Sequence, residues 1–210
     1  MAQNKVALKR RIRSVRATKK ITNAMELIAT SKLQRQKQKM ELNRVYASTL
    51  FQAFNRVLGS ANIQEIPYLT EREGKTLTLV FVSDMGLCGG YNSNILNKIK
   101  ESIPNDQLLF MVGSKGRSWL RRFDYHLFGE LHTGDNLSYG HIAKAADKIM
   151  DAYLSGEITK LQVLYTKFVN TMTFEPNIVT LLPISESVLP TKDTQEVLNQ
   201  DIIFEPDAVT

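Results

Sequence analysis

The residues that could do chemistry in this sequence gather after its first predicted strand. The run "SDMGLCGGYN" at residues 83–92 contains the only cysteine, Cys88, together with Asp84 and three glycines. A thiol near a helix N-terminus can become a nucleophile, because its thiolate form is favoured there. No nearby histidine completes a dyad, although a partner from elsewhere in the fold stays open, and the favoured interpretation is a small buried thiol. Asp84 could act as an acid, but an aspartate at a strand end more commonly forms a turn.

The same run invites a nucleotide-binding interpretation, which its spacing does not support. A dinucleotide fingerprint requires G-x-G-x-x-G, and a phosphate loop requires G-x-x-x-x-G-K-[ST]. Here the pattern is G-x-x-G-G, with no lysine or hydroxyl residue in the required place. We therefore interpret the glycines as a tight turn at the end of a buried strand and expect no cofactor. The three histidines, His126, His132 and His141, are too scattered to predict a metal site.

Downstream of residue 74, β-rich runs alternate with helical patterns. This alternation predicts an α/β layered domain with a mostly parallel sheet. A short basic helix is predicted over 115–122, and another helix near 95–99 can be capped by Asn92 or Ser93. The predicted strands are 75–84, 107–113, a weaker one at 126–131, 160–168 and 177–184. A helix is predicted over 138–156, with Ile142, Ala145, Ala146, Ile149 and Tyr153 facing inward.

The first 58 residues have the pattern of one long helix. They contain no proline, and the first glycine is Gly59. Such a stretch is far longer than an ordinary globular helix and indicates a coiled coil or a strut. Its apolar residues recur at steps of three and four on one narrow stripe, which is typical of a seam that a single partner helix covers. We predict a shaft over 1–58 and a connection over 59–74; the stripe holds Leu8, Ile12, Val15, Ile21, Met25 and Ile28.

Charge is distributed unevenly along the chain. Residues 1–40 hold twelve Lys and Arg against one acid, Glu26, although the whole chain has a net charge of only +6. The remainder is therefore net negative, and the chain is a basic arm on a mildly acidic body. Such an arm usually contacts an anionic partner. Two partners stay open on this ground: acidic protein surfaces around a shaft, or nucleic acid bound through its phosphates. The arm lacks an aromatic residue before Tyr46 that could stack on bases.

Composition limits the classes of protein to which this chain can belong. Hydrophobic residues make up 43% and charged residues 23%, as in an ordinary globular protein. No apolar run reaches the roughly 18 residues of a membrane span. One cysteine excludes an internal disulfide and indicates a reducing compartment. The N-terminal sequence does not fit a secretory signal peptide, because no apolar core of suitable length follows its basic start. A mitochondrial transit peptide fits the basic start better, but the helical pattern continues past Glu26 without a cleavage site.

Two long motifs carry a resemblance to a known family. The stretch "KRRIRSVRATKKITNAMELIATSKL" resembles the N-terminal helix of the gamma subunits of F-type ATP synthases, whose pattern is I-x-S-V-x-x-T-x-x-I-T-x-A-M-x-x-V-A-x-x-K. "SDMGLCGGYNSNI" resembles that family's S-D-R-G-L-C-G-x-x-N-x-x-[IV], and "TMTFEPNIVTLLPI" is similar to its later strand region. The resemblance covers essentially the whole chain. In the first motif the matching residues are Ile12, Ser14, Val15, Thr18, Ile21, Thr22, Ala24, Met25, Ala29 and Lys32.

The resemblance implies a central shaft. In that family the N- and C-terminal helices form an antiparallel coiled coil inside a ring of alpha and beta subunits. A Rossmann-like body sits on the c-ring beside epsilon, at the cytoplasmic face of the bacterial cell membrane. Rotation couples proton flow to ATP synthesis or hydrolysis, and the subunit is not catalytic and binds no nucleotide. The subunit-contact residues implied by the motif match are Arg13, Lys20, Ile21, Thr22, Met25, Ile28, Lys32, Asp84, Gly86, Leu87, Cys88 and Gly89.

The sequence departs from the family pattern in two places. Met85 stands where the family has a basic residue, which removes one charge from an expected subunit contact. The chain stops at "DIIFEPDAVT", where the family continues into its C-terminal helix. We expect a fragment in which residues 75–205 form the body and 206–210 lead toward that missing helix. The isolated chain is then expected to self-associate through its uncovered N-terminal helix.

Overall fold

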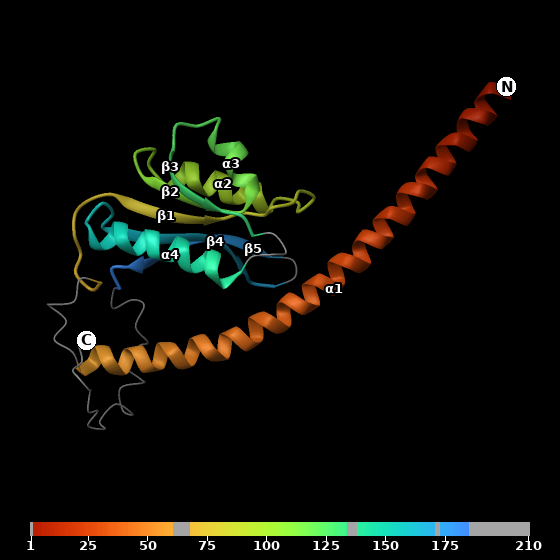
Figure 1. The fold of residues 1–210 in the computed structure, drawn as a ribbon. Coiled ribbons are helices and arrows are strands. Elements are labelled where there is room, and N and C mark those ends of the chain that lie inside the picture. Colours follow the sequence, from red (N-terminus) through yellow and green to blue (C-terminus); the bar gives the residue numbers. More distant parts are fainter. Residues whose placement is uncertain (1, 61–67, 134–137, 171–172, 185–210) are drawn as a thin grey trace. The chain divides into compact units, whose positions relative to one another are not determined.

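The computed structural model describes residues 2–60, 68–133, 138–170 and 173–184, in two compact units, Met1–Ser60 and Ala61–Thr210. The first unit is a single helix, α1 (Ala2–Ser60), of 59 residues (Figure 1). At 1.5 Å per residue it is about 90 Å long. The prediction of one uninterrupted helix is therefore confirmed. Residues 61–67 of the predicted connection, 185–205 of the predicted body and the segment 206–210 lie outside the described residues.

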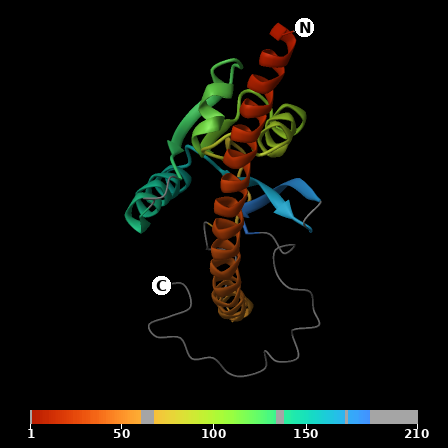
Figure 2. The same ribbon diagram turned by 90° about the vertical axis from the view of Figure 1, so that its right-hand side faces the viewer.

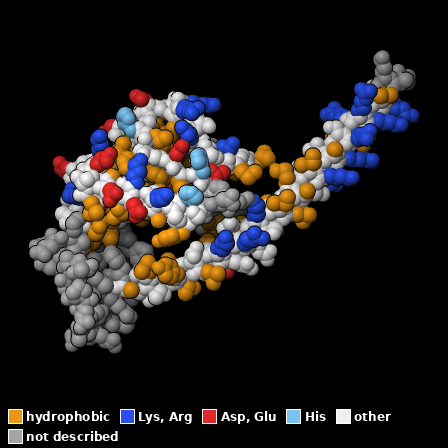
Figure 3. Space-filling model, viewed as in Figure 1, with side chains coloured by type: hydrophobic (Ala, Val, Ile, Leu, Met, Phe, Trp, Pro, Cys, Tyr) orange, Lys and Arg blue, Asp and Glu red, His pale blue; other side chains and the backbone are white. Residues whose placement is uncertain are grey.

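The apolar stripe of α1 is uncovered within its own unit. Ile21 is 61% exposed, Met25 44% and Ile28 59%. Lys and Arg side chains crowd the N-terminal half of the helix, with hydrophobic side chains between them (Figure 3). The hydroxyl of Thr22 donates to the carbonyls of Thr18 and Lys19, so it is used within the helix. A helix with so little covered apolar surface derives its stability from packing against a partner.

We expect the isolated chain to self-associate through α1, because the uncovered stripe has the width that one helix covers. Sedimentation velocity across a range of concentrations should show a dimer or a larger species that dissociates on dilution. Hydrogen exchange should be slow in the paired helix and fast in the dissociated chain. A monomer at all concentrations whose α1 amides are fully protected would contradict this prediction.

The second unit is built on a five-stranded sheet in the order β3-β2-β1-β4-β5 (Figure 1). β1 pairs with both β2 and β4 in parallel, β2 pairs with β3 in parallel, and β5 is antiparallel to β4. The predicted α/β class with a mostly parallel sheet is therefore confirmed. The strands are β1 (Thr76–Phe81), β2 (Leu108–Val112), β3 (His126–Leu131), β4 (Lys160–Phe168) and β5 (Phe174–Leu182). β5 begins three residues before the predicted strand.

Three helices cover the two faces of this sheet. α2 (Tyr91–Ser102) and α3 (Ser114–Leu120) pack on one face, and α4 (Tyr139–Leu154) packs on the other (Figures 1 and 2). Each face has its own apolar core, one containing Ile95, Ile99 and Leu120, and the other Ile149 and Tyr153. The inward face predicted for α4 was partly wrong: Ile142 and Ala146 are exposed. The face of α4 that contacts the sheet therefore includes only part of the apolar stripe of this helix.

The first and last described residues of the second unit lie next to each other. The amide of Ile184, just after β5, donates to the carbonyl of Tyr68 at 2.9 Å. Tyr68 in turn stacks on Tyr153 of α4, with ring centroids 6.1 Å apart. Among the described residues, no helix combines the length and the apolar character needed to cross a membrane.

Candidate subunit-contact site

The predicted contact residues form two groups, each within one unit. Seven lie on α1 and are exposed along it: Arg13, Lys20, Ile21, Thr22, Met25, Ile28 and Lys32. The other five, Asp84, Gly86, Leu87, Cys88 and Gly89, lie in the loop that joins β1 to α2, which we call the β1–α2 loop (residues 82–90). The loop residues lie close together in sequence, whereas those on α1 extend along the helix from Arg13 to Lys32.

The β1–α2 loop lies at the carboxyl edge of the parallel strands, where the strand order changes direction. The chain leaves β1 toward β2 on one side, while β4 lies on the other. In open α/β sheets, binding sites form outside the carboxyl ends of the strands at this switch point. The fold therefore places the family motif where a site of this architecture is expected.

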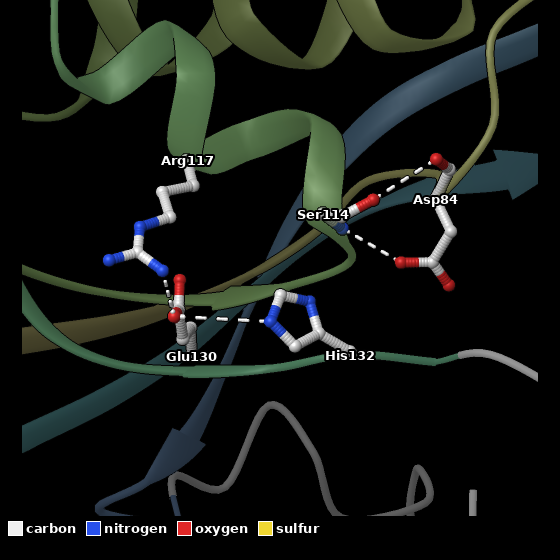
Figure 4. A network of polar contacts seen from close by, with 5 residues as sticks. All are labelled: Asp84, Ser114, Arg117, Glu130 and His132. Carbon is white, nitrogen blue, oxygen red and sulfur yellow. Dashed lines mark hydrogen bonds and ion pairs between the residues drawn. The ribbon is translucent and has the colours of Figure 1, made fainter. Parts of the chain in front are cut away.

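Asp84 ties the ends of three strands together. Its carboxylate accepts a hydrogen bond from the Ser114 amide at 2.8 Å, and the Ser114 hydroxyl donates to the Asp84 carbonyl at 3.0 Å (Figure 4). The other carboxylate oxygen accepts a hydrogen bond from the hydroxyl of Thr133, which follows β3. The Thr133 hydroxyl first, and then the Ser114 groups, hold the pKa of Asp84 below its ordinary value of 3.8 against the opposing effect of burial. The carboxylate is thus engaged inside the body.

We expect Asp84 to make stability fall in acid. Because its folded-state pKa is lowered, its contribution is fully present above the unfolded value of 3.8 and is lost as pH falls through the lower folded value. Urea unfolding, followed by the fluorescence of the single tryptophan, Trp119, should show a larger deficit for Asp84→Ala at pH 6 than at pH 2.5. Thr133→Val should reduce that difference, since it removes the main donor. Equal deficits at both pH values would contradict the assignment.

Asn92 holds the other end of the loop. Its side-chain oxygen accepts from the Ser83 amide at 3.0 Å, and its side-chain nitrogen lies 2.7 Å from the Ser83 hydroxyl oxygen and 3.2 Å from the Cys88 sulfur. The predicted capping role of Asn92 or Ser93 is wrong, because the N-cap residue of α2 is Gly90 and no side chain caps it. Asn92 is instead used in contacts with the preceding loop.

Between these two anchors the loop adopts a strained shape. Leu87 has φ +62° and Gly89 has φ +58°, a region that favours glycine. The side chain of Leu87 is 93% exposed and that of Met85 is 72% exposed. Cys88 is also exposed, so the expected small buried thiol is wrong. The loop presents an apolar surface.

A second polar cluster lies beside the first. Arg117 of α3 forms an ion pair with Glu130 of β3 at 2.7 Å, and His132 lies 3.9 Å from the same carboxylate oxygen (Figure 4). This ion pair links α3 to β3 at the surface of the body. No group of three or more potential ligands that could hold a metal ion occurs in the described part of the chain. The arrangement suits a rigid protein-contact loop.

Sequence reasoning missed the residues that hold the loop. Ser114 and Thr133 lie 30 and 49 positions from Asp84, and no local pattern links them to it. The role of Asn92 in the loop could have been suspected from the sequence, since this residue occupies the asparagine position of the resembled motif.

Comparisons with known proteins decide the family. A family model described as "ATP synthase" matches residues 4–210. The ATP synthase gamma chain of Clostridium novyi (strain NT) is 34% identical over 207 residues, covering 96% of this chain and 71% of that relative. The chain belongs to the ATP synthase gamma chain family. Another gamma chain, from Haemophilus influenzae (strain PittGG), is 37% identical over 95% of this chain and 72% of its own.

A solved structure supports the fold of this gamma chain family member. The central stalk and c-ring structure of the Tetrahymena thermophila mitochondrial ATP synthase contains a chain that aligns with a TM-score of 0.59 and 23% identity. The alignment covers 90% of this chain and 82% of that one. The combination of a long helix and a mostly parallel α/β sheet is thus found in a known central stalk.

Proposed function

We propose that this chain is the central-stalk rotor subunit of a proton-translocating F-type ATP synthase. In this role α1 is one helix of an antiparallel coiled coil within a ring of alpha and beta subunits, and the body contacts the c-ring and epsilon. Rotation changes the conformation of the catalytic beta subunits, so the chain itself is non-catalytic. The observation that carries the proposal is the 34% identity to a gamma chain over 96% of this chain.

The surface of α1 supports a shaft. Its narrow uncovered stripe suits one partner helix, and we assign Ile21, Met25 and Ile28 to that contact. Arg13, Lys20 and Lys32 lie on the exposed helix and suit acidic protein surfaces, which they would meet through long-range attraction. The hydroxyl of Thr22 is engaged with its own backbone, so it adds no donor to such a contact.

The body supports the same role. The amide of Ile184 donates to the carbonyl of Tyr68, so the first and last described residues of the second unit lie next to each other. The β1–α2 loop, with Gly86, Leu87, Cys88 and Gly89, is the proposed contact of the body with a neighbouring subunit. Since the curated relatives compared above come from bacteria, we place the protein at the cytoplasmic face of a bacterial membrane, bound peripherally.

Reconstitution tests this function. The chain, extended by the remaining C-terminal segment of the Clostridium novyi gamma chain, should co-elute with alpha, beta and epsilon subunits in size-exclusion chromatography and support ATP hydrolysis. Lys20→Glu should weaken the complex, and Lys144→Glu, on the exposed face of α4, should leave it unchanged. An extended chain that never joins alpha and beta subunits would refute the proposal.

The nucleic-acid-binding alternative gains no support from the comparisons. Its distinguishing property is binding to duplex or single strands that falls steeply as salt rises. A flat salt profile in that assay would remove it.

A further inference from the structure

The stretch that contains the end of α2 and all of α3 carries an excess of positive charge on an otherwise acidic body. Residues 98–124 contain six Lys and Arg against three acids. Residues 68–97 and 125–184 together contain six Lys and Arg against nine acids. One side of the sheet, where α2 and α3 lie (Figures 1 and 2), therefore attracts anions while the rest of the body repels them.

Three cations of this stretch are available to a partner. Lys100, Arg121 and Arg122 are exposed, and none of them forms an ion pair with another described residue. Arg117 differs from them, because its charge is matched by Glu130 inside the body. The positive charge that faces solvent therefore lies at the end of α2 and in the turn after α3.

Aromatic rings lie beside these cations. The ring centroid of Trp119 is 4.4 Å from that of Phe123 and 5.8 Å from that of Tyr125. The ammonium nitrogen of Lys100 lies 4.3 Å from the centroid of the Phe123 ring and 5.7 Å from that of Trp119. Phe123 remains 37% exposed. We call Lys100, Trp119, Arg121, Arg122 and Phe123 together the basic–aromatic face.

This face lies at the opposite edge of the sheet from the β1–α2 loop. α2 leads into β2 and α3 leads into β3, and both strands belong to the parallel part of the sheet with β1. The ends of α2 and α3 are therefore near the edge at which β1 begins, whereas the loop follows the end of β1. A strand of six residues separates the two edges by roughly 20 Å. The two surfaces can contact different partners at the same time.

We propose that the basic–aromatic face binds the anionic headgroup layer of a membrane. Arg121 and Arg122 pair with lipid phosphates, and Trp119 and Phe123 lie at the level of the headgroups. This inference deepens the proposed function and rests on it, because it assumes that the body works at a membrane surface.

The composition of the face favours lipid over an acidic protein segment or a nucleic acid. Lys and Arg attract anionic lipids, and aromatic rings are enriched at the membrane–water interface, so one surface accommodates both kinds of side chain. An acidic protein segment would match the cations and offer nothing to the exposed ring of Phe123. A nucleic acid needs open ring faces for stacking, but Trp119 packs on Phe123 and Tyr125, and Lys100 lies over Phe123.

The fluorescence of Trp119 tests this contact in the full chain, because it is the only tryptophan and lies in the proposed surface. The probe is a vesicle of phosphatidylglycerol and phosphatidylcholine in equal parts, with bromine on the phosphatidylcholine acyl chains as a contact quencher. The emission should shift to shorter wavelength and be quenched. Vesicles of brominated phosphatidylcholine alone should leave it unchanged. α1 also attracts anionic vesicles, but it contains no tryptophan and contributes no signal.

Arg121→Ala combined with Arg122→Ala tests the assignment to these residues. At saturating vesicle concentration, the quenched fraction gives the ratio of docked to undocked bodies. This ratio should fall about 30-fold, since each Lys or Arg near an anionic surface contributes about fivefold. Lys144→Ala combined with Lys167→Ala is the matched control, because it removes the same charge from exposed positions on α4 and β4. It should leave the ratio unchanged, and both double variants should unfold at the urea concentration of the unaltered chain.

Three results would overturn the proposal. The first is a chain that sediments with anionic vesicles while its Trp119 emission is neither shifted nor quenched, because α1 alone then holds the chain on the vesicle. The second is an emission shift with poly-glutamate or polyuridylate and none with anionic vesicles, because the face then serves an acidic protein or a nucleic acid. The third is an equal loss of quenching in the two double variants, because the effect then follows from total charge.

Failure of this inference is distinguishable from failure of the proposed function. The quenching experiment uses no other subunit. If the extended chain never joins alpha and beta subunits but Trp119 is quenched, the function is wrong and the lipid contact stands. If the extended chain joins them and Trp119 is not quenched, only the lipid contact is wrong.

Discussion

Replacing Gly113 by alanine is expected to lower the free energy of unfolding of the body by about 4 kcal/mol. Gly113 joins β2 to α3 with φ +109°, a conformation that side chains rarely adopt. A Cβ there would lie 2.1 Å from the carbonyl oxygen of Val82 and 2.7 Å from its carbonyl carbon. The substitution therefore combines backbone strain with a backbone collision.

The neighbours of Gly113 cannot move away without further loss. The amide of Val82 donates to the Val112 carbonyl at 2.8 Å, and the amide of Gly113 donates to the Leu131 carbonyl at 2.8 Å. Shifting either chain breaks bonds that join the ends of β1, β2 and β3. The same shift would displace Ser114 from Asp84, so the contact loop should be lost together with stability.

Chemical denaturation followed by Trp119 fluorescence measures this effect. Gly86→Ala is the matched control, because no atom lies within 4 Å of the position its Cβ would take and its φ is outside the strained region. It should change stability by about 0.5 kcal/mol or less. If Gly113→Ala unfolds at nearly the same urea concentration as Gly86→Ala, the prediction is wrong. The turn between β2 and α3 can then accommodate a methyl group at little cost in free energy.

The regular elements of the body could be predicted because their signals are local. The alternating run that forms β4 has the predicted bounds, and the apolar run that forms β1 begins one residue later and ends three residues earlier than predicted. β5 was predicted to begin at residue 177, directly after Pro176, which is three residues too late. Proline is tolerated at the edge of a sheet, and β5 is an edge strand. Whether a strand lies at the edge of a sheet depends on the order of all the strands, which a short stretch of sequence does not reveal.

The candidate site could be predicted only in part, because its internal bonds join distant positions. The motif located the loop, but Asp84 meets Ser114 and Thr133 only once three strand ends lie side by side. Asn92 satisfies the local rule for a helix cap, but its side-chain amide bonds to the backbone and hydroxyl of Ser83 in the preceding loop instead. Cys88 was expected to be buried, and a glycine-rich loop that projects from the sheet edge leaves it exposed.

The two predicted contact surfaces differ in chemistry, and this difference follows from their sequences. α1 combines a thin apolar stripe with dense positive charge, which suits one packed helix and acidic surroundings. The β1–α2 loop presents uncharged apolar residues on a rigid frame, which suits a shaped pocket. Salt should therefore weaken contacts of α1 much more than those of the loop.

Met25→Asp is expected to lower the affinity of the extended chain for alpha and beta subunits at least about 100-fold, because it leaves an unpaired charge in the seam between paired helices. Met25 lies at the centre of the stripe, between Ile21 and Ile28, and is 44% exposed when the helix is unpaired. In the isolated chain, the same substitution should convert the self-associated species into monomer. Size-exclusion chromatography of the complex and sedimentation of the isolated chain measure the two effects.

Leu27→Asp is the matched control for this prediction. Leu27 is 73% exposed and lies about 200° around the helix from Met25, away from the stripe. It introduces the same charge on the same helix, so it should leave both assembly and self-association nearly unchanged. If both variants lose affinity equally, the added negative charge acts by reducing the positive charge of α1 and not by disrupting the stripe. Loss for Met25→Asp alone would identify the stripe as the surface that a partner helix covers.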